Sequence, residues 1–229
     1  MGLETTSGDG MDQSGLIASL RAKLGLRLGI MGGAFDPIHM AHLVVAEEAL
    51  LQFRLDQVLF MPAGDPPHKD RRMPPADLRY LLVSAATAGN PRFSVSRFEI
   101  DRDAVSYTVD TLEYLSGVVA PGSELFFLIG GDAALDILTW KRPERVLELA
   151  SFIVATRPGY DLSRLSESLE QIELRSPASG AADRVKVMEI PGLAISSSMI
   201  RQRLAEGKPV RYLVPDVVAE LIEKSGFYV

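Results

Sequence analysis

Several features are missing from this sequence of 229 residues, and each absence excludes a class of protein. Cysteine is absent, which excludes a disulfide framework, a thiolate nucleophile and a zinc site with cysteine ligands. No apolar run approaches the roughly 18 residues that a membrane span requires. Residues 1–14 lack a basic region followed by an apolar block, so we expect no secretory signal and a cytoplasmic location.

The sequence also lacks a surplus of basic residues. Lys and Arg total 24 against 30 Asp and Glu, which gives a formal net charge of -6. Neither nucleic acid nor a membrane is therefore an expected partner, although a small anion needs only a local cluster of donors. The G-x-x-x-x-G-K-[ST] motif is absent, which excludes a P-loop enzyme, and the lack of G-x-G-x-x-G argues against a standard dinucleotide oxidoreductase.

Short apolar runs alternate with amphipathic segments along the chain. The pattern predicts strands at residues 27–31, 56–61, 93–100 (with a break near Ser96), 125–129, 151–155 and 185–190. It predicts helices at residues 76–88, 109–115, 133–138, 143–149, 197–205 and 217–224, and one more from about Leu43, with residues 159–183 as a mostly variable connection. This alternation indicates a single α/β domain: a Rossmann-like, doubly wound parallel sheet with helices on both faces. Because ligands bind such sheets beyond the carboxyl ends of the strands, the loops after Met31, Met61 and Ile129 should converge on one site.

The glycine turn after the first strand is the most informative stretch. Gly32 and Gly33 allow a ligand to approach the backbone where a Cβ would push it away. His39 and His42 follow, three residues apart, and share one face of the first helical turn. A helix N-terminus attracts anions, so this stretch predicts a phosphate site with two imidazole donors.

Two other interpretations of these histidines stay open. With His68 and Asp36 they could form a metal site, since three histidines can hold a catalytic zinc. They could also be ordinary surface or core histidines. That interpretation is weakened because two of the chain's 3 histidines lie beside the same glycine pair.

A second informative stretch lies near the other end of the chain. Ser196, Ser197 and Ser198 precede a predicted helix, and Arg201 follows one helical turn later. A single serine would suffice to cap the helix. Three hydroxyls and a guanidinium exceed that need, which favours a second group of anion donors.

These motifs resemble a known family. Residues 32–42 resemble the GG-T-FDP-x-H-x-GH signature of the HxGH-motif nucleotidyltransferases, and residues 195–201 resemble their ISST-x-x-R signature. Residues 66–69, 106–112, 127–140, 157–160 and 211–215 narrow the resemblance to bacterial nicotinate-nucleotide adenylyltransferases. The resemblance covers residues 26–229, so we expect residues 25–229 to form the nucleotidyltransferase domain and residues 1–24 a largely disordered extension. Ala34, Ala41 and Ser198 depart from the signatures without abolishing the chemistry they imply.

The resemblance implies transfer of the adenylyl group of ATP to nicotinate mononucleotide, giving deamido-NAD and pyrophosphate by in-line attack on the α-phosphorus. It implies His39, His42 and Arg201 as catalytic residues. It implies binding of ATP and its phosphates by Gly32, Gly33, Phe35, His68, Lys69, Asp132, Ile195, Ser196, Ser197 and Ser198. Tyr107, Thr108 and Trp140 would bind the nicotinate, and Mg²⁺ would arrive mainly on the ATP phosphates, without a dedicated protein cage.

Alternatives remain at this point. A related adenylyltransferase could act on nicotinamide mononucleotide or on phosphopantetheine, and a non-catalytic nucleotide-binding module or a zinc hydrolase would belong to other classes. Trp140 could belong to the core, Thr108 could only cap a helix and Tyr107 could only pack. A homo-oligomer is also compatible with the sequence.

Overall fold

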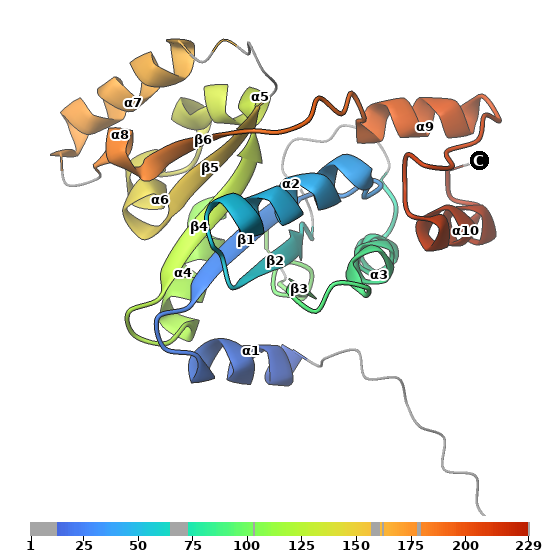
Figure 1. Cartoon of the computed structure of the whole chain (residues 1–229), viewed down its shortest axis with the longest axis horizontal. Coiled ribbons are helices and arrows are strands. Elements are labelled where there is room, and N and C mark those ends of the chain that lie inside the picture. Colours follow the sequence, from blue (N-terminus) through green and yellow to red (C-terminus); the bar gives the residue numbers. More distant parts are fainter. Residues whose placement is uncertain are drawn as a thin grey trace, which may run out of the picture.

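A parallel sheet of six strands organises the chain, in the order β3-β2-β1-β4-β5-β6 (Figure 1). The computed structural model describes residues 13–64, 73–102, 104–156, 161, 163–177 and 180–228. The strands are β1 (Arg27–Gly33), β2 (Gln57–Pro62), β3 (Phe93–Val95), β4 (Glu124–Gly130), β5 (Ser151–Thr156) and β6 (Val185–Glu189). Every adjacent pair is parallel, which confirms the predicted sheet.

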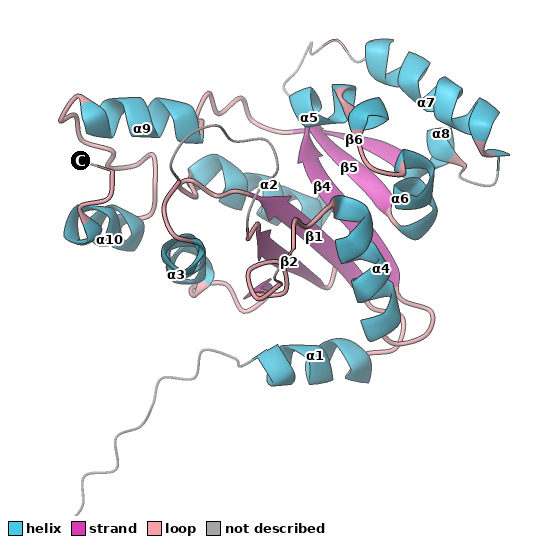
Figure 2. Ribbon diagram, turned by 180° about the vertical axis from the view of Figure 1, so that it is seen from behind, coloured by secondary structure: helices cyan, strands magenta, loops and turns pink. Residues whose placement is uncertain are grey.

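Helices cover both faces of this sheet, as predicted (Figure 2). They are α1 (Gln13–Ala22), α2 (Met40–Gln52), α3 (Ala76–Thr87), α4 (Thr108–Val118), α5 (Gly131–Leu135), α6 (Pro143–Leu149), α7 (Ser163–Arg175), α8 (Ala181–Arg184), α9 (Ser197–Ala205) and α10 (Asp216–Ser225). A 3₁₀ turn, Ile137–Thr139, follows α5. One buried apolar cluster joins the sheet to α1, α4, α6 and α7, and a second joins its other face to α2, α3, α9 and α10.

The strand order reverses between β1 and β4. The chain runs outward from β1 through β2 to β3, then returns to place β4 against the free edge of β1 and continues to β5 and β6. Gly29 of β1 lies between Val58 of β2 and Phe126 of β4. The two loops that leave β1 and β4 therefore diverge, and in open α/β sheets this reversal opens a crevice that binds ligands.

Two predicted segments differ from the structure. Residues 93–100 were expected to be strand-like with a break near Ser96; β3 does end at Val95, but no strand resumes after it, and the backbone N–H of Ile100 donates to the carbonyl of Arg97 (2.8 Å) in a turn. Residues 159–183 were expected to be a variable connection, but they include α7. Its Leu165, Leu169 and Ile172 recur at helical spacing and are buried, so the apolar stripe stabilises a helix despite its polar surroundings.

The first described helix packs against the domain. Leu16 and Leu20 of α1 are buried in the core, and the Leu20 carbonyl accepts a hydrogen bond from the backbone of Ala120 (3.3 Å). Residues 13–22 of the expected extension are thus helical rather than disordered. Among the described residues, no helix combines the length and apolar character that a membrane span requires.

Candidate functional site

Two adjoining cavities open beyond the carboxyl ends of β1 and β4. The first cavity has a volume of about 610 Å³ and lies on the α2 and α9 side. The second cavity has a volume of about 700 Å³ and lies on the α4 side. Gly32, Ile129 and Ala133 line both, so a molecule in one cavity would meet a molecule in the other at these residues. Ala63, which follows β2, lines the second cavity, so the three predicted loops do converge.

Gly32 forms the boundary between the cavities. A Cβ at this position would lie 3.3 Å from the ring of Phe127, closer than most side-chain contacts allow. A side chain at this position would therefore have to displace the Phe127 ring by a few tenths of an ångström, and glycine avoids that contact.

The two histidines of the Gly–His turn (residues 32–42) stack against each other beside the first cavity. Their ring centroids are 3.7 Å apart with an interplanar angle of 23°, and both residues line the cavity. Burial lowers the pKa of His39 from 6.5 to about 4, despite an opposing backbone hydrogen bond. Burial, followed by the proximity of His39, lowers the pKa of His42 well below 6.5. Both imidazoles are therefore uncharged at neutral pH.

The hydrogen bonds of the Gly–His turn define how His42 can act. The backbone N–H of His39 donates to Nδ1 of His42 at 3.2 Å. An acceptor nitrogen carries no proton, so the neutral ring carries its proton on Nε2 and can donate from there. The buried Nδ1 of His39 has no hydrogen-bond partner within the described ranges.

Several other predicted residues line the same cavity. Asp132 lies in the first turn of α5, directly after β4, and Ile195 and Ser196 precede α9. Ser196 is the N-cap of α9, where its hydroxyl accepts a hydrogen bond from the backbone of Met199 at 3.2 Å. The first cavity thus combines residues from both ends of the chain, as the two motifs predicted.

Four predicted residues lie behind the cavity wall rather than on it. Arg201 donates from one guanidinium nitrogen to the carbonyl of Asp36 (2.7 Å) and from the other to the Ser198 hydroxyl (2.9 Å). Ser197 donates to the Pro37 carbonyl at 2.9 Å. Phe35 is buried and sets the edge of its ring against His42, with centroids 5.1 Å apart. These side chains therefore hold the Gly–His turn in place.

The second cavity contains the predicted nicotinate residues. Tyr107 and Thr108 lie at the N-terminal end of α4, and Trp140 faces them from the loop after the 3₁₀ turn. Trp140 also packs at a steep angle on Phe127, with centroids 6.0 Å apart. The core and binding interpretations of Trp140 are therefore compatible, because one part of the residue packs inward while the residue still lines the cavity.

Three further residues of the second cavity escaped the sequence analysis. Glu99 is buried, and its carboxylate accepts a hydrogen bond from Thr111 at 2.6 Å; burial raises its pKa. The Ser106 hydroxyl oxygen is buried without a hydrogen bond to any described residue. The ammonium of Lys141 lies 4.2 Å above the Tyr107 ring. Only Ser106 lies inside a recognised motif; Glu99 was assigned to a strand that ends four residues earlier.

Three predicted residues remain: Gly33 lines the second cavity rather than the first, and His68 and Lys69 lie outside the described residues. The zinc interpretation, which required His68, gains no support from the rest: within the described ranges, no group of three or more His, Asp and Glu side chains could hold a metal ion. The first cavity instead offers two uncharged imidazoles and the carboxylate of Asp132.

Comparisons with known proteins agree with this geometry. The sequence model of a family described as cytidylyltransferase-like matches residues 30–203. A probable nicotinate-nucleotide adenylyltransferase of Moorella thermoacetica is 49% identical over 203 residues, which cover 88% of this chain and 91% of that protein. Its counterpart in Thermoanaerobacter is 46% identical over 204 residues, which cover 89% of this chain and 94% of that protein.

Solved structures show the same fold. The nicotinic acid mononucleotide adenylyltransferase of Plasmodium falciparum in complex with NaAD aligns with a TM-score of 0.69 over 89% of this chain and 97% of that one. Its sequence identity is 19%, so this likeness concerns the fold.

Proposed function

The chain belongs to the nicotinate-nucleotide adenylyltransferase family, and we propose that it transfers the adenylyl group of ATP to nicotinate mononucleotide. The products would be deamido-NAD and pyrophosphate, in the biosynthesis of NAD. The observation that carries this proposal is the pair of adjoining cavities with a shared wall at Gly32, Ile129 and Ala133. A reaction that joins two nucleotides needs two such cavities, with the reacting atoms at their boundary.

The reaction proceeds by direct displacement. A phosphate oxygen of nicotinate mononucleotide, in the second cavity, attacks the α-phosphorus of ATP in the first. The new P–O bond forms as the bond to the bridging oxygen breaks, and pyrophosphate leaves with that electron pair. No residue of the chain forms a covalent intermediate, so the protein acts by positioning both reactants and by stabilising charge.

The uncharged imidazoles act as fixed hydrogen-bond donors in this mechanism. His42 donates from Nε2 to an oxygen of the reacting phosphates, because its Nδ1 is already an acceptor. His39 forms the other part of the stacked pair. Arg201 lies behind the wall of the first cavity, where it donates to the Asp36 carbonyl and the Ser198 hydroxyl, so its part is to hold the Gly–His turn in place.

The second cavity favours an anionic ring substituent. The first turn of α4 has backbone N–H groups without intrahelical partners, at the positive end of the helix dipole. Lys141 adds a positive charge beside Tyr107. A nicotinate carboxylate would gain from both, and a nicotinamide would gain less, because it carries no net charge. Trp140 would stack on the pyridine ring.

ATP in this family carries a divalent cation, and the donors of the first cavity fit Mg²⁺ bound mainly through phosphates. Mg²⁺ prefers oxygen ligands and retains several waters, and Asp132 is the carboxylate that lines this cavity. When bound, Mg²⁺ would neutralise part of the phosphate charge. Since ATP is the substrate, the cytoplasm remains the location that we propose; a homo-oligomer stays compatible with the proposal.

A panel of substrates tests the function. Purified protein with ATP and Mg²⁺ should release pyrophosphate with nicotinate mononucleotide, more slowly with nicotinamide mononucleotide, and least with phosphopantetheine. The reversed order for the two mononucleotides would assign the chain to the amide substrate. No pyrophosphate with any acceptor, together with intact binding of ATP, would instead support a non-catalytic nucleotide-binding module.

A further inference from the structure

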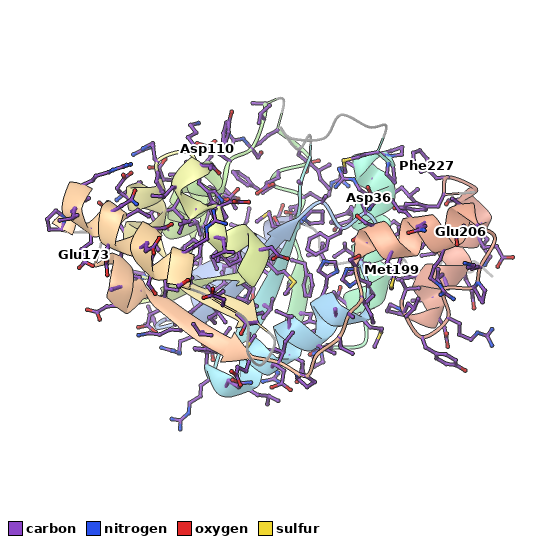
Figure 3. All side chains as sticks on the ribbon, turned by 90° about the horizontal axis from the view of Figure 1, so that it is seen from above. Asp36, Asp110, Glu173, Met199, Glu206 and Phe227 are labelled. Atoms are coloured by element: carbon purple, nitrogen blue, oxygen red, sulfur yellow. The ribbon has the colours of Figure 1, made fainter. Side chains whose placement is uncertain are left out.

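The carboxylate of Asp36, in the Gly–His turn, is approached by two side chains from the C-terminal part of the chain. Asp36 is 1% exposed. The hydroxyl of Tyr228, after α10, donates to Asp36 Oδ1 at 3.0 Å. The guanidinium of Arg201, on α9, lies 3.8 Å from Oδ2 of the same carboxylate. In Figure 3, Asp36 lies beside α9, on the same side of the molecule as Phe227.

Further bonds join the same regions. Ser197 of α9 donates to the carbonyl of Pro37 at 2.9 Å. The backbone N–H of Met40, the first residue of α2, donates to the carbonyl of Leu213 at 2.9 Å. Residues 36–40 are therefore held by the C-terminal region. His39 lies within this held segment.

The Gly–His turn needs such support. Phe35 has a φ of 45°, in the left-handed region that a bulky L-residue rarely adopts. Such a conformation persists only where the surrounding contacts define it strongly. Asp36 follows Phe35 directly and precedes His39 by three residues, so a shift of Asp36 would move the imidazoles.

We propose that Tyr228 is a positioning residue for adenylyl transfer, acting through Asp36 on the placement of His39 and His42. The proposal rests on the proposed function. Tyr228 also packs against the apolar cluster of α2, α3, α9 and α10, so its aromatic ring contributes to stability. The positioning role belongs to its hydroxyl, which distinguishes it from a residue that only anchors the tail.

The first test removes this hydroxyl alone. Tyr228→Phe keeps the ring and its packing, and should lower kcat roughly tenfold, with the KM for ATP changed less than about twofold, because a hydrogen bond to a charged group is among the stronger ones. Tyr212→Phe is the matched control, since Tyr212 is 80% exposed. A lower melting temperature for Tyr228→Phe with an unchanged kcat would make Tyr228 a structural anchor and overturn the proposal.

A double-mutant cycle tests the route through Asp36. Asp36→Asn retains an oxygen acceptor without the charge, so the Tyr228→Phe change should reduce kcat less in that background than in the wild-type chain. If the fold loss in kcat of the double variant equals the product of the losses in the two single variants, Tyr228 does not act through Asp36.

A third measurement needs no turnover. The chain has 3 histidines, so the side-chain ¹⁵N signals of His42 can be assigned with a His42→Gln variant. Tyr228→Phe should shift these signals, and Tyr212→Phe should not; unchanged signals would contradict the proposal. If the wild-type chain proves inactive with every acceptor, the proposed function fails, while this measurement still tests the link between Tyr228 and the imidazoles.

Discussion

The two cavities lie side by side, but their walls differ in origin and in charge. The first cavity takes its histidines from one continuous turn, and these uncharged donors are the buried His39 and the half-buried His42. The second cavity draws on residues from separate segments, among them the buried carboxyl of Glu99 and the ammonium of Lys141. Tyr107 on its wall is 36% exposed. Under the proposed function, the reaction would depend on a preorganised turn, whereas the choice of acceptor would depend on side chains that can change independently.

Replacing His42 should have the largest effect. His42→Ala removes the Nε2–H donor, and the loss of one preorganised donor typically costs about 100- to 1000-fold in kcat. Steady-state release of pyrophosphate measures this change. His42→Gln places an amide N–H near the same position and should restore part of the rate. A rate equal to that of the wild-type chain in His42→Ala would remove His42 from the mechanism.

Replacing Trp140 should affect the second cavity selectively. Trp140→Ala removes the stacking surface and should raise the KM for nicotinate mononucleotide about 10- to 100-fold, the range expected for a base stacked on an aromatic ring. The KM for ATP should stay nearly constant. Trp140→Phe keeps an aromatic face and serves as the control for packing on Phe127. An equal rise in both KM values would show that the two cavities are not separable.

Replacing Lys141 should change selectivity more than rate. Lys141→Met removes a half-exposed charge, so the ratio of kcat/KM for the nicotinate over the nicotinamide substrate should fall by at most about fivefold, the usual scale of an exposed charge pair. Arg142→Met is the matched control, because Arg142 pairs with Glu113 and does not line the cavity. A constant ratio would assign the selectivity to the backbone N–H groups of α4.

The pH dependence of stability belongs to the first cavity, and it is measured on folding rather than on the rate. In the folded chain the pKa of His39 is lowered to about 4, whereas the unfolded chain takes up its proton near 6.5. The unfolded state therefore binds more protons between these values, so the free energy of unfolding should fall as the pH is lowered from about 6.5 to about 4. Chemical denaturation measures it, and His39→Gln should weaken the dependence. An identical pH dependence in that variant would mean that His39 is not buried in its neutral form.

The sequence predicted the sheet, the helices on both faces and the convergence of three loops. These features follow from local patterns: apolar runs such as residues 125–129, and adjacent glycines at a strand end. It also predicted that residues 196–201 would complete the phosphate site; Ser196 lines the first cavity, whereas Ser197, Ser198 and Arg201 lie behind its wall.

Features set by long-range packing could not be predicted in this way. Nothing near Tyr228 in the sequence points to Asp36, because 192 positions separate the two residues. The motif marks Arg201 as an anion donor, but only the packing of α9 beside the Gly–His turn brings its guanidinium to the Asp36 carbonyl. Glu99 escaped notice because its segment alternates like a strand, while the chain turns away after Val95. The helix α7 was detectable in principle, since its apolar residues keep helical spacing.

The burial of the two imidazoles also bears on how the site empties after each turnover. A pair of fixed positive charges would attract ATP and the released pyrophosphate alike, and the product would dwell in the cavity. Uncharged donors attract a polyanion far less. They bind only an oxygen that lies in the direction of the N–H bond. Only interactions that strengthen in the transition state accelerate a reaction. Under the proposed function, the desolvation that lowers the pKa of His39 and His42 would thus favour departure of the leaving group as well as its formation.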